Sequence, residues 1–407
     1  MIQRKAFQFR LVPKASQRQQ MTQIAGCNRF AWNRALALLR GALERGEKVE
    51  RYNTLAKRLP VWKEEVETSF LSEAPSQTLQ QTLKDLDRAL GDFFAKTKGA
   101  PKFKKRGMHD SFRYPQGFKI EGNRVFLPKI GWMRFRKSRQ IEGIAKNITV
   151  SKRADEWYIS VQVECEKEEK PHPHFDREVG IDMGIAQFAT LSDGNILKPH
   201  HAYRRNEHLL AKEQRNVARK KKGSHNREKQ VTRIQRLHKK IADSRKDYLH
   251  KATTWIAKNH GRIVLEDLKV SNMSQSARGT VEKPGRNVAA KSGLNKSILD
   301  QGWFEFKRQL AYKLAWQGGE LLVVNPKNTS RRCQKCGFIS AENRKTQASF
   351  VCISCGHKDH ADLNAAKNIL TVGQTGMACG SNPSMGRKQE LLGKRSSRQR
   401  AEQVPAG

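Results

Sequence analysis

Two C-x-x-C pairs constrain the fold of this 407-residue chain more than any other feature of its sequence. Cys333 and Cys336 form the first pair, and Cys352 and Cys355 form the second after fifteen intervening residues. Each pair offers two thiolates from one tight turn, so the four sulfurs can surround a single Zn²⁺ ion tetrahedrally. An iron–sulfur cluster is the alternative, but the spacing matches a zinc ribbon and not the ferredoxin patterns. Because the chain supplies all four ligands, we predict a structural zinc site within a ribbon over residues 330–357.

The charge of the chain indicates a polyanionic partner. The sequence holds 79 Lys and Arg against 39 Asp and Glu, a formal net charge of +40. Such an excess is costly in self-repulsion unless phosphates neutralise it, so nucleic acid is the expected partner. A membrane surface is the weaker alternative, because the cations are spread along the chain and no stretch approaches the roughly 18 apolar residues of a spanning helix. We therefore predict a cytoplasmic protein without a membrane partner.

Hydrophobic patterning divides the chain into a β part, a helical part and an α/β part. Alternating apolar residues predict a strand up to Pro13 and several short strands after Gly99, separated by a stretch with helical spacing. Beyond Arg177 strands and helices alternate, which predicts a multidomain chain of α+β and α/β parts. The predicted spans are 1–13 with 96–172 for a small β-barrel, 14–95 for a helical insert, 175–329 with 358–372 for an α/β domain, 330–357 for the ribbon, and 373–407 for a disordered basic tail.

A strongly basic stretch lies inside the predicted α/β domain. Residues 211–250 hold 14 Lys or Arg against 4 Asp or Glu, and Lys220, Lys221 and Lys222 are consecutive. A solvated helical face is the ordinary explanation of such a run. Since the whole chain shares the basic bias, we predict instead that these lysines contact nucleic acid.

Three acidic residues occupy positions at which carboxylates can collect in one site. Asp182 ends the segment V-G-I-D, Glu266 ends the segment I-V-L-E, and Asp362 begins the segment D-L-N-A-A. Taken singly, an acid at a strand end or a helix N-terminus has an ordinary structural explanation. Together they match an RNase H-like fold, which gathers one acid from its first strand, one from a later strand and one from a helix. Such ligands suit Mg²⁺, and two ions about 4 Å apart can promote phosphodiester hydrolysis.

Four segments of the chain, taken in sequence order, resemble the TnpB family, transposon-encoded relatives of the type V CRISPR effectors. They are the G-I-D-x-G strand, the V-L-E-D-L strand, the four-cysteine ribbon and the D-L-N-A-A helix. The resemblance covers nearly the whole chain and includes G-C-N-R-F-A-W-N from Gly26 and P-K-F-K-K from Pro101. It implies a wedge barrel, a helical recognition insert and a RuvC-like nuclease domain. It also implies that Asp182, Glu266 and Asp362 are the catalytic acids, which hold Mg²⁺.

The resemblance further implies the partners of the protein. These are a guide RNA from the transposon end and target double-stranded DNA, bound by a monomer in a ribonucleoprotein. The same resemblance places Tyr52 and Gln80 of the helical insert at a short flanking motif beside the target. The sequence departs from the family in its last motif, where many members have H-D-R-D-x-N-A-A and this chain has D-H-A-D-L-N-A-A from Asp359. We retain Asp362 as the ligand because it lies four residues before Ala366.

Three functions are compatible with these features to different degrees. An RNA-guided DNA endonuclease needs the complete acid triad, which the sequence contains. A repressor that binds DNA through a guide without cleaving it would be favoured by a missing carboxylate. A transposase or transposase accessory protein acting on transposon ends would need its own Tyr or Ser nucleophile, and the sequence shows no such constellation. We therefore expect a Mg²⁺-dependent DNA endonuclease.

Overall fold

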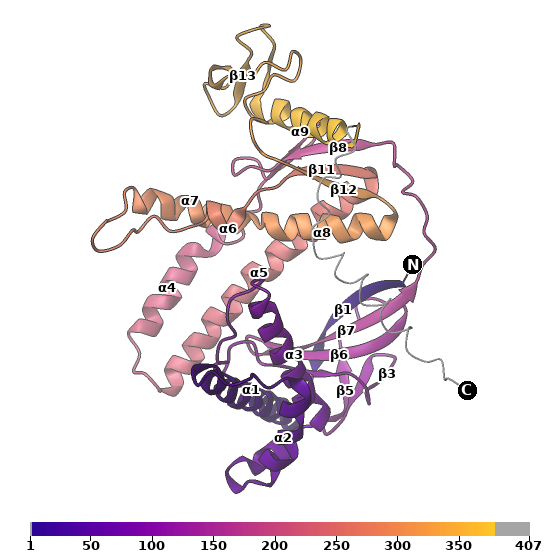
Figure 1. Ribbon diagram of the computed structural model, residues 1–407, viewed down its shortest axis with the longest axis vertical. Helices are drawn as coiled ribbons and strands as arrows, with labels where there is room; N and C mark the ends of the chain where they lie inside the picture. Colours follow the sequence, from indigo (N-terminus) through magenta and orange to yellow (C-terminus); the bar gives the residue numbers. More distant parts are fainter. Residues whose placement is uncertain (1, 379–407) are drawn as a thin grey trace. The chain divides into compact units, whose positions relative to one another are not determined.

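The computed structural model describes residues 2–378 (Figure 1). Tertiary contacts divide the chain into two compact units. The first contains the residues up to Glu168 together with Arg219–Lys239, and the second contains Glu169–Ala218 and the residues from Lys240 onward. Residues 219–239, which the sequence alone groups with the α/β domain, therefore have their tertiary contacts in the first unit. Within the described residues, none of the helices combines the length and apolar character needed to span a bilayer.

The first unit is built on a seven-stranded antiparallel sheet with the order β2-β6-β7-β1-β5-β4-β3. Among the described strands no pairing joins β2 to β3, so the sheet is open and its closure into a barrel stays a prediction. The strands are β1 (Ile2–Val12), β2 (Ser111–Tyr114), β3 (Lys119–Glu121), β4 (Arg124–Leu127), β5 (Gly131–Phe135), β6 (Ile144–Arg153) and β7 (Glu156–Glu166).

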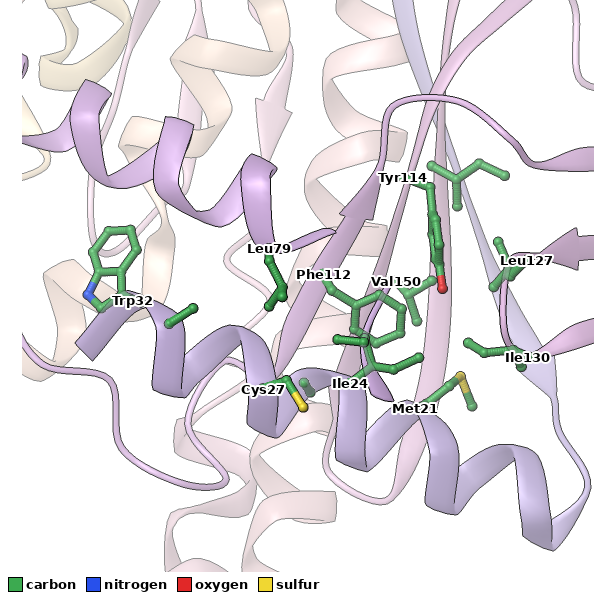
Figure 2. Packing of buried hydrophobic residues seen from close by; sticks show 14 of the residues in the cluster. Met21, Ile24, Cys27, Trp32, Leu79, Phe112, Tyr114, Leu127, Ile130 and Val150 are labelled. Atoms are coloured by element: carbon green, nitrogen blue, oxygen red, sulfur yellow. The ribbon is translucent and has the colours of Figure 1, made fainter. Parts of the chain in front are cut away.

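A helical segment between β1 and β2 covers one face of this sheet. Its elements are α1 (Ala15–Glu44), α2 (Tyr52–Glu64), the 3₁₀ helix η1 (Val66–Glu73) and α3 (Ser76–Phe94). Helical spacing places apolar residues of α1 on one side, where Met21 and Ile24 meet Phe112, Tyr114 and Val150 of the sheet (Figure 2). Helices and sheet thus share one hydrophobic core.

The second unit contains a five-stranded mixed sheet with the order β10-β9-β8-β11-β12. Neighbours β8, β11 and β12 are parallel, whereas β8, β9 and β10 are antiparallel in succession. This sheet confirms the strands that the sequence predicts on either side of the basic stretch. Its strands are β8 (Glu178–Asp182), β9 (Ala189–Leu191), β10 (Ile196–Leu197), β11 (Arg262–Glu266) and β12 (Glu320–Val324).

Helices and a small ribbon complete the second unit. The basic stretch is not one continuous helix, because it is interrupted between Ala218 and His225, where Gly223 has a φ of +80°. The remaining elements are η2 (Arg204–Asn206), α4 (Glu207–Ala218), α5 (His225–Asn259, which begins in the first unit), α6 (Val270–Met273), α7 (Val288–Gln301), α8 (Trp303–Gln317), η3 (Ala341–Asn343), β13 (Ser349–Val351), β14 (Lys358–His360) and α9 (Ala361–Ala378).

Helix α9 lies in backbone contact with the second sheet. An added Cβ on Gly180 of β8 would lie 2.2 Å from the carbonyl oxygen of Ala366, and one on Gly373 would lie 2.7 Å from both γ-carbons of Val264. These two glycines therefore let α9 approach β8 and β11. The sequence predicted a disordered tail from residue 373, but α9 continues to Ala378, so the prediction is wrong for residues 373–378. The rest of that predicted tail, 379–407, lies outside the described residues.

Candidate active site and metal centre

Three acids converge at one edge of the second sheet. Asp182 is the last residue of β8 and Glu266 is the last residue of β11. In the parallel register Ile181 pairs with Leu265, so the next residues, Asp182 and Glu266, end neighbouring strands at the same level. Asp362 is the second residue of α9, which packs on β8. The fold thus brings together the three acids that the sequence singles out.

The electrostatics of Asp182 show how close the three charges are. Burial first, and then the charges of Glu266 and Asp362, raise the pKa of Asp182 to about 7, against the opposing effect of Arg344. Glu266 is 8% exposed, and burial raises its pKa despite the hydroxyl that Thr329 donates to it. A site that holds several carboxylates out of water favours a bound proton or cation.

Arg344 is a residue of this site that the sequence does not reveal. It follows η3 in the ribbon, and its Nη2 donates to Asp362 Oδ1 at 2.9 Å and to the carbonyl oxygen of Gln347 at 2.9 Å. Both members of the ion pair are largely buried. No spacing rule links Arg344 to Asp362, because their contact depends on how the ribbon folds back onto α9.

The four cysteines form a compact sulfur cluster. The Sγ atoms of Cys333 and Cys355 are 3.7 Å apart, and those of Cys336 and Cys352 are 3.6 Å apart. Two similar turns present them, since Gly337 donates its N–H to the Cys333 carbonyl oxygen and Gly356 donates to that of Cys352. Both glycines have positive φ, at +78° and +71°. The cluster can hold a metal ion.

The carboxylates are spread more widely than the sulfurs. Among the described residues, only the cysteine cluster brings three or more Cys, His, Asp or Glu ligand atoms all within 4.8 Å of one another. Two further acids near the triad have other partners. Asp267 pairs with Lys307 at 2.8 Å, and Asp359 pairs with Lys367 at 2.8 Å.

Three asparagine and threonine side chains join the ribbon to the acids. Asn364 and Asn368 of α9 both donate to the carbonyl oxygen of Arg332, and the backbone N–H of Gln334 donates to Asn364 Oδ1. Asn368 also donates to the carbonyl oxygen of Thr329, whose hydroxyl binds Glu266. The segment that leads into the first cysteine pair is therefore fixed to α9 and to β11.

The residues predicted to contact nucleic acid lie in the first unit. Tyr52 begins α2 and is half-buried, and Gln80 of α3 is exposed. Lys84, four residues after Gln80, places its Nζ 4.9 Å from the centre of the Tyr52 ring. Tyr52 and Gln80 therefore border one surface. The lysines at 220–222 lie in the turn between α4 and α5, and the last two are exposed.

Three family models match the chain. One described as "Probable transposase" (OrfB of IS605) matches residues 160–277, a Cas12f1-like TNB domain matches 303–369, and a helix-turn-helix domain matches 1–48. The last of these names does not describe the structure, in which strand β1 is followed by the single long helix α1. The second model covers the ribbon and the first half of α9.

Curated relatives match the chain over nearly its full length. It is 52% identical to the protein named "Putative RNA-guided DNA endonuclease InsQ" from Escherichia coli K12, over 95% of this chain and 96% of that protein. It is 34% identical to a "Putative RNA-guided DNA endonuclease" from Streptomyces pristinaespiralis, over 99% and 98% of the two chains. The Cas12f1 chain of a cryo-EM complex with single-guide RNA and target DNA shares the fold, with a TM-score of 0.57 and 14% identity over 90% of this chain and 98% of that one. The extent and identity of these matches show that the chain belongs to the TnpB (IS605 OrfB) family.

Proposed function

We propose that this protein is a transposon-encoded RNA-guided DNA endonuclease. In this proposal a guide RNA from the transposon end pairs with target DNA beside a short flanking motif, and the protein cleaves the DNA by two-metal phosphodiester hydrolysis. The observation that carries the proposal is the convergence of Asp182, Glu266 and Asp362 at one sheet edge. The names of the relatives and the net charge of +40 support the nucleic-acid partners.

The donor set of the triad fits magnesium. Carboxylate oxygens are the ligands that Mg²⁺ prefers. Burial and the mutual repulsion of the acids, which together raise the pKa of Asp182, are both offset by a bound cation. When bound, Mg²⁺ supplies Lewis-acid stabilisation and lowers the pKa of water for attack on a phosphodiester. Thr329 orients Glu266 by its hydrogen bond, and Arg344 orients Asp362. In this proposal the three acids hold the metal and these two residues position them.

The sulfur cluster fits one zinc ion. A tetrahedron with Zn–S bonds of about 2.3 Å places its sulfurs about 3.8 Å apart. This is close to the 3.7 Å between the Sγ atoms of Cys333 and Cys355 and the 3.6 Å between those of Cys336 and Cys352. These separations suit one ion rather than the several irons of an iron–sulfur cluster. We assign the zinc a structural role, because the ribbon that it would stabilise carries Arg344 to Asp362.

We also propose that Tyr52 and Gln80 recognise the flanking motif. Their support is the surface that they border together with Lys84. A Tyr52→Ala, Gln80→Ala double variant should change the preferred motif in a cleavage assay with a library of flanking sequences. Lys48→Ala, which removes an exposed side chain of the same segment just before α2, is the control. Identical motif preferences of the double variant and the wild type would remove these residues from recognition.

The decisive experiment is cleavage of a matching duplex by guide-loaded protein in Mg²⁺. Asp182→Ala should abolish cleavage but leave guide-dependent DNA binding nearly unchanged, because base pairing and phosphate contacts lie elsewhere. Asp267→Ala is the matched control, since this neighbouring strand-end acid pairs with Lys307 and should be dispensable for cutting. Normal cleavage by Asp182→Ala would refute the triad. Guide-dependent binding by wild type without any cleavage would favour the repressor.

A further inference from the structure

One oxygen of the Glu266 carboxylate is already bound by the protein. The hydroxyl of Thr329 lies 2.5 Å from Oε1. The other oxygen, Oε2, has no hydrogen-bond partner among the described residues and remains open to solvent. Thr329 and Glu266 are 4% and 8% exposed, so bulk water competes little for the contact between them. The fold thus occupies one oxygen of this acid and leaves the second available.

The single proton of the Thr329 hydroxyl is directed to Glu266. A second acceptor within reach of this hydroxyl is the carbonyl oxygen of Pro326, at 3.1 Å. A hydroxyl has one hydrogen to donate, so it can serve only one of these two acceptors well. The contact with the carboxylate is the shorter, and a charged acceptor roughly doubles the strength of a hydrogen bond. The hydroxyl hydrogen therefore lies against Oε1 when Glu266 is ionised.

Helix α9 holds Thr329 in this position. The side-chain amide of Asn368 donates to the carbonyl oxygen of Thr329 at 2.9 Å and to that of Arg332 at 2.6 Å, so both of its hydrogens are used. Asn368 is buried, and the loop between these two carbonyls is closed by the N–H of Arg332, which donates to the carbonyl oxygen of Asn328 at 3.0 Å. The loop cannot shift without breaking buried hydrogen bonds. The hydroxyl is therefore held in place rather than free to adapt to a ligand.

Asp362 shows the same arrangement as Glu266. Arg344 donates to its Oδ1, and Oδ2 has no hydrogen-bond partner among the described residues. Two acids from different elements thus each offer one open oxygen. Binding through one oxygen suits Mg²⁺, which demands near-octahedral geometry. Ca²⁺ takes about six to eight oxygens and readily accepts both oxygens of one carboxylate, so it loses more when one of them is occupied.

We propose that Thr329 is a positioning residue that restricts Glu266 to binding through one oxygen and thereby makes the acid triad prefer Mg²⁺ to Ca²⁺. The inference rests on the proposed function, in which the triad holds Mg²⁺. A cation that approaches both oxygens of Glu266 meets the hydroxyl hydrogen on Oε1 and must displace it. Binding through Oε2 alone keeps this hydrogen bond. If Thr329 only satisfied a buried carboxylate, its loss would lower stability and leave the metal preference unchanged.

The test measures binding of Mg²⁺ and of Ca²⁺ to the full-length protein in separate calorimetric titrations. Thr329→Val is close to threonine in shape but removes the donor. It should raise the affinity for Ca²⁺ relative to Mg²⁺ about ten-fold, because a hydrogen bond to a charged group no longer has to be broken. Thr329→Ser keeps the hydroxyl and should keep the wild-type ratio. Thr329→Ala makes no steric demand and should reproduce the ratio of Thr329→Val even if the valine folds poorly.

Thr253→Val is the matched control for the loss of a buried hydroxyl. Thr253 of α5 is 0% exposed, and its hydroxyl donates to the carbonyl oxygen of Leu249 at 2.7 Å instead of to an acid of the triad. This variant should lower the unfolding temperature and leave the ratio of the two metal affinities as in wild type. In guide-loaded cleavage with Mg²⁺, added Ca²⁺ should inhibit Thr329→Val at a concentration about ten-fold lower than it inhibits wild type.

A wild-type ratio of metal affinities in Thr329→Val, or a ratio in Thr329→Ser equal to that of Thr329→Val, would overturn the proposal. Asp182→Ala separates this outcome from failure of the proposed function. If Asp182→Ala binds both ions as wild type does, the triad is not the metal site, and the proposed function fails together with this inference. If Asp182→Ala loses ion binding while Thr329→Val keeps the wild-type ratio, the role of Thr329 alone is refuted.

Discussion

Replacing Gly180 by alanine should displace the helix that carries Asp362. An alanine Cβ at this position would lie 2.2 Å from the carbonyl oxygen of Ala366 and 2.6 Å from the backbone nitrogen of Leu370. Ordinary contacts lie near 3.5 Å, so α9 must move by about 1 Å where it crosses β8. Both partners are backbone atoms and cannot change rotamer. The strain must therefore be relieved by the position of α9 itself.

The expected cost follows from the size of this overlap. Forcing one extra methyl group into a packed site costs about 1–3 kcal/mol, which for a unit of this size lowers the unfolding temperature by about 2–12 °C. A shift of about 1 Å in a catalytic group can lower the rate roughly 100-fold. Because Asp362 lies four residues before Ala366 on the same helix, we expect cleavage to fall by a larger factor than the fraction of folded protein.

The measurements are calorimetry and guide-loaded cleavage of the Gly180→Ala variant. Gly376→Ala is the matched control, because the same substitution in α9 meets no atom within 4 Å and should leave the unfolding temperature equal or raise it through better helix propensity. If Gly180→Ala unfolds and cleaves as wild type does, the contact between α9 and β8 does not position the active site, and the reasoning from backbone approach is refuted.

Three further predictions concern the metal centre, the basic turn and a buried lysine. Purified protein should contain one equivalent of zinc, and Cys352→Ser should lose most of it by elemental analysis, whereas a metal content below half an equivalent in wild type would exclude the site. Neutralising the lysines at 220–222 to Gln should flatten the salt dependence of nucleic-acid binding by roughly 0.7–0.9 for each lost phosphate contact, and an unchanged slope would make the turn an ordinary solvated surface. Burial lowers the pKa of Lys313 to about 8, so between about pH 8 and 10 the unfolded chain binds more protons than the folded chain. In urea titrations, the free energy of unfolding of wild type relative to that of Lys313→Met should therefore rise with pH over this range. A difference that stays flat or falls would contradict this.

Sequence patterns predicted that the three acids would lie together because local spacing indicates where each strand ends and where the helix begins. The strands ending in Asp182 and Glu266 are short, buried runs, and parallel neighbours end at a common edge, so their acids had to be near each other once they paired. The cysteine spacing predicted the ribbon turns for the same reason. Arg344 could not be predicted, because its ion pair with Asp362 joins the ribbon to α9 through tertiary structure only.

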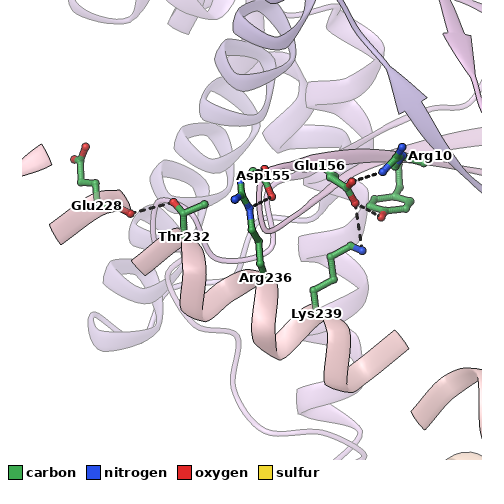
Figure 3. Close-up of polar contacts among 8 residues, drawn as sticks. Arg10, Asp155, Glu156, Glu228, Thr232, Arg236 and Lys239 are labelled. Atoms are coloured by element: carbon green, nitrogen blue, oxygen red, sulfur yellow. Dashed lines mark hydrogen bonds and ion pairs between the residues drawn. The ribbon is translucent and has the colours of Figure 1, made fainter. Parts of the chain in front are cut away.

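Fold boundaries were harder to predict where contacts between distant segments decide them. A polar composition after Gly373 indicated disorder, yet α9 continues to Ala378 because Gly373 packs against Val264. The composition of the basic stretch did not predict that residues 219–239 make their tertiary contacts within the first unit. The contacts that hold this part of the chain include ion pairs of Arg236 with Asp155 and of Lys239 with Glu156 (Figure 3), which no local pattern predicts.

The two asparagines of α9 give the D-L-N-A-A segment a role beyond its acid. Asn364 and Asn368 are buried, at 0% and 2% exposed, and both bind the backbone just before Cys333. Since Thr329 in the same stretch binds Glu266, one hydrogen-bonded chain connects a strand acid, the zinc-ribbon entry and the helix of the third acid. A buried amide that loses its partner costs about 1–3 kcal/mol, so this chain resists any slip of the ribbon relative to α9. The cysteine turns and the carboxylates are thereby connected through hydrogen bonds whose donors are all uncharged, and these bonds are less sensitive to salt than exposed ion pairs.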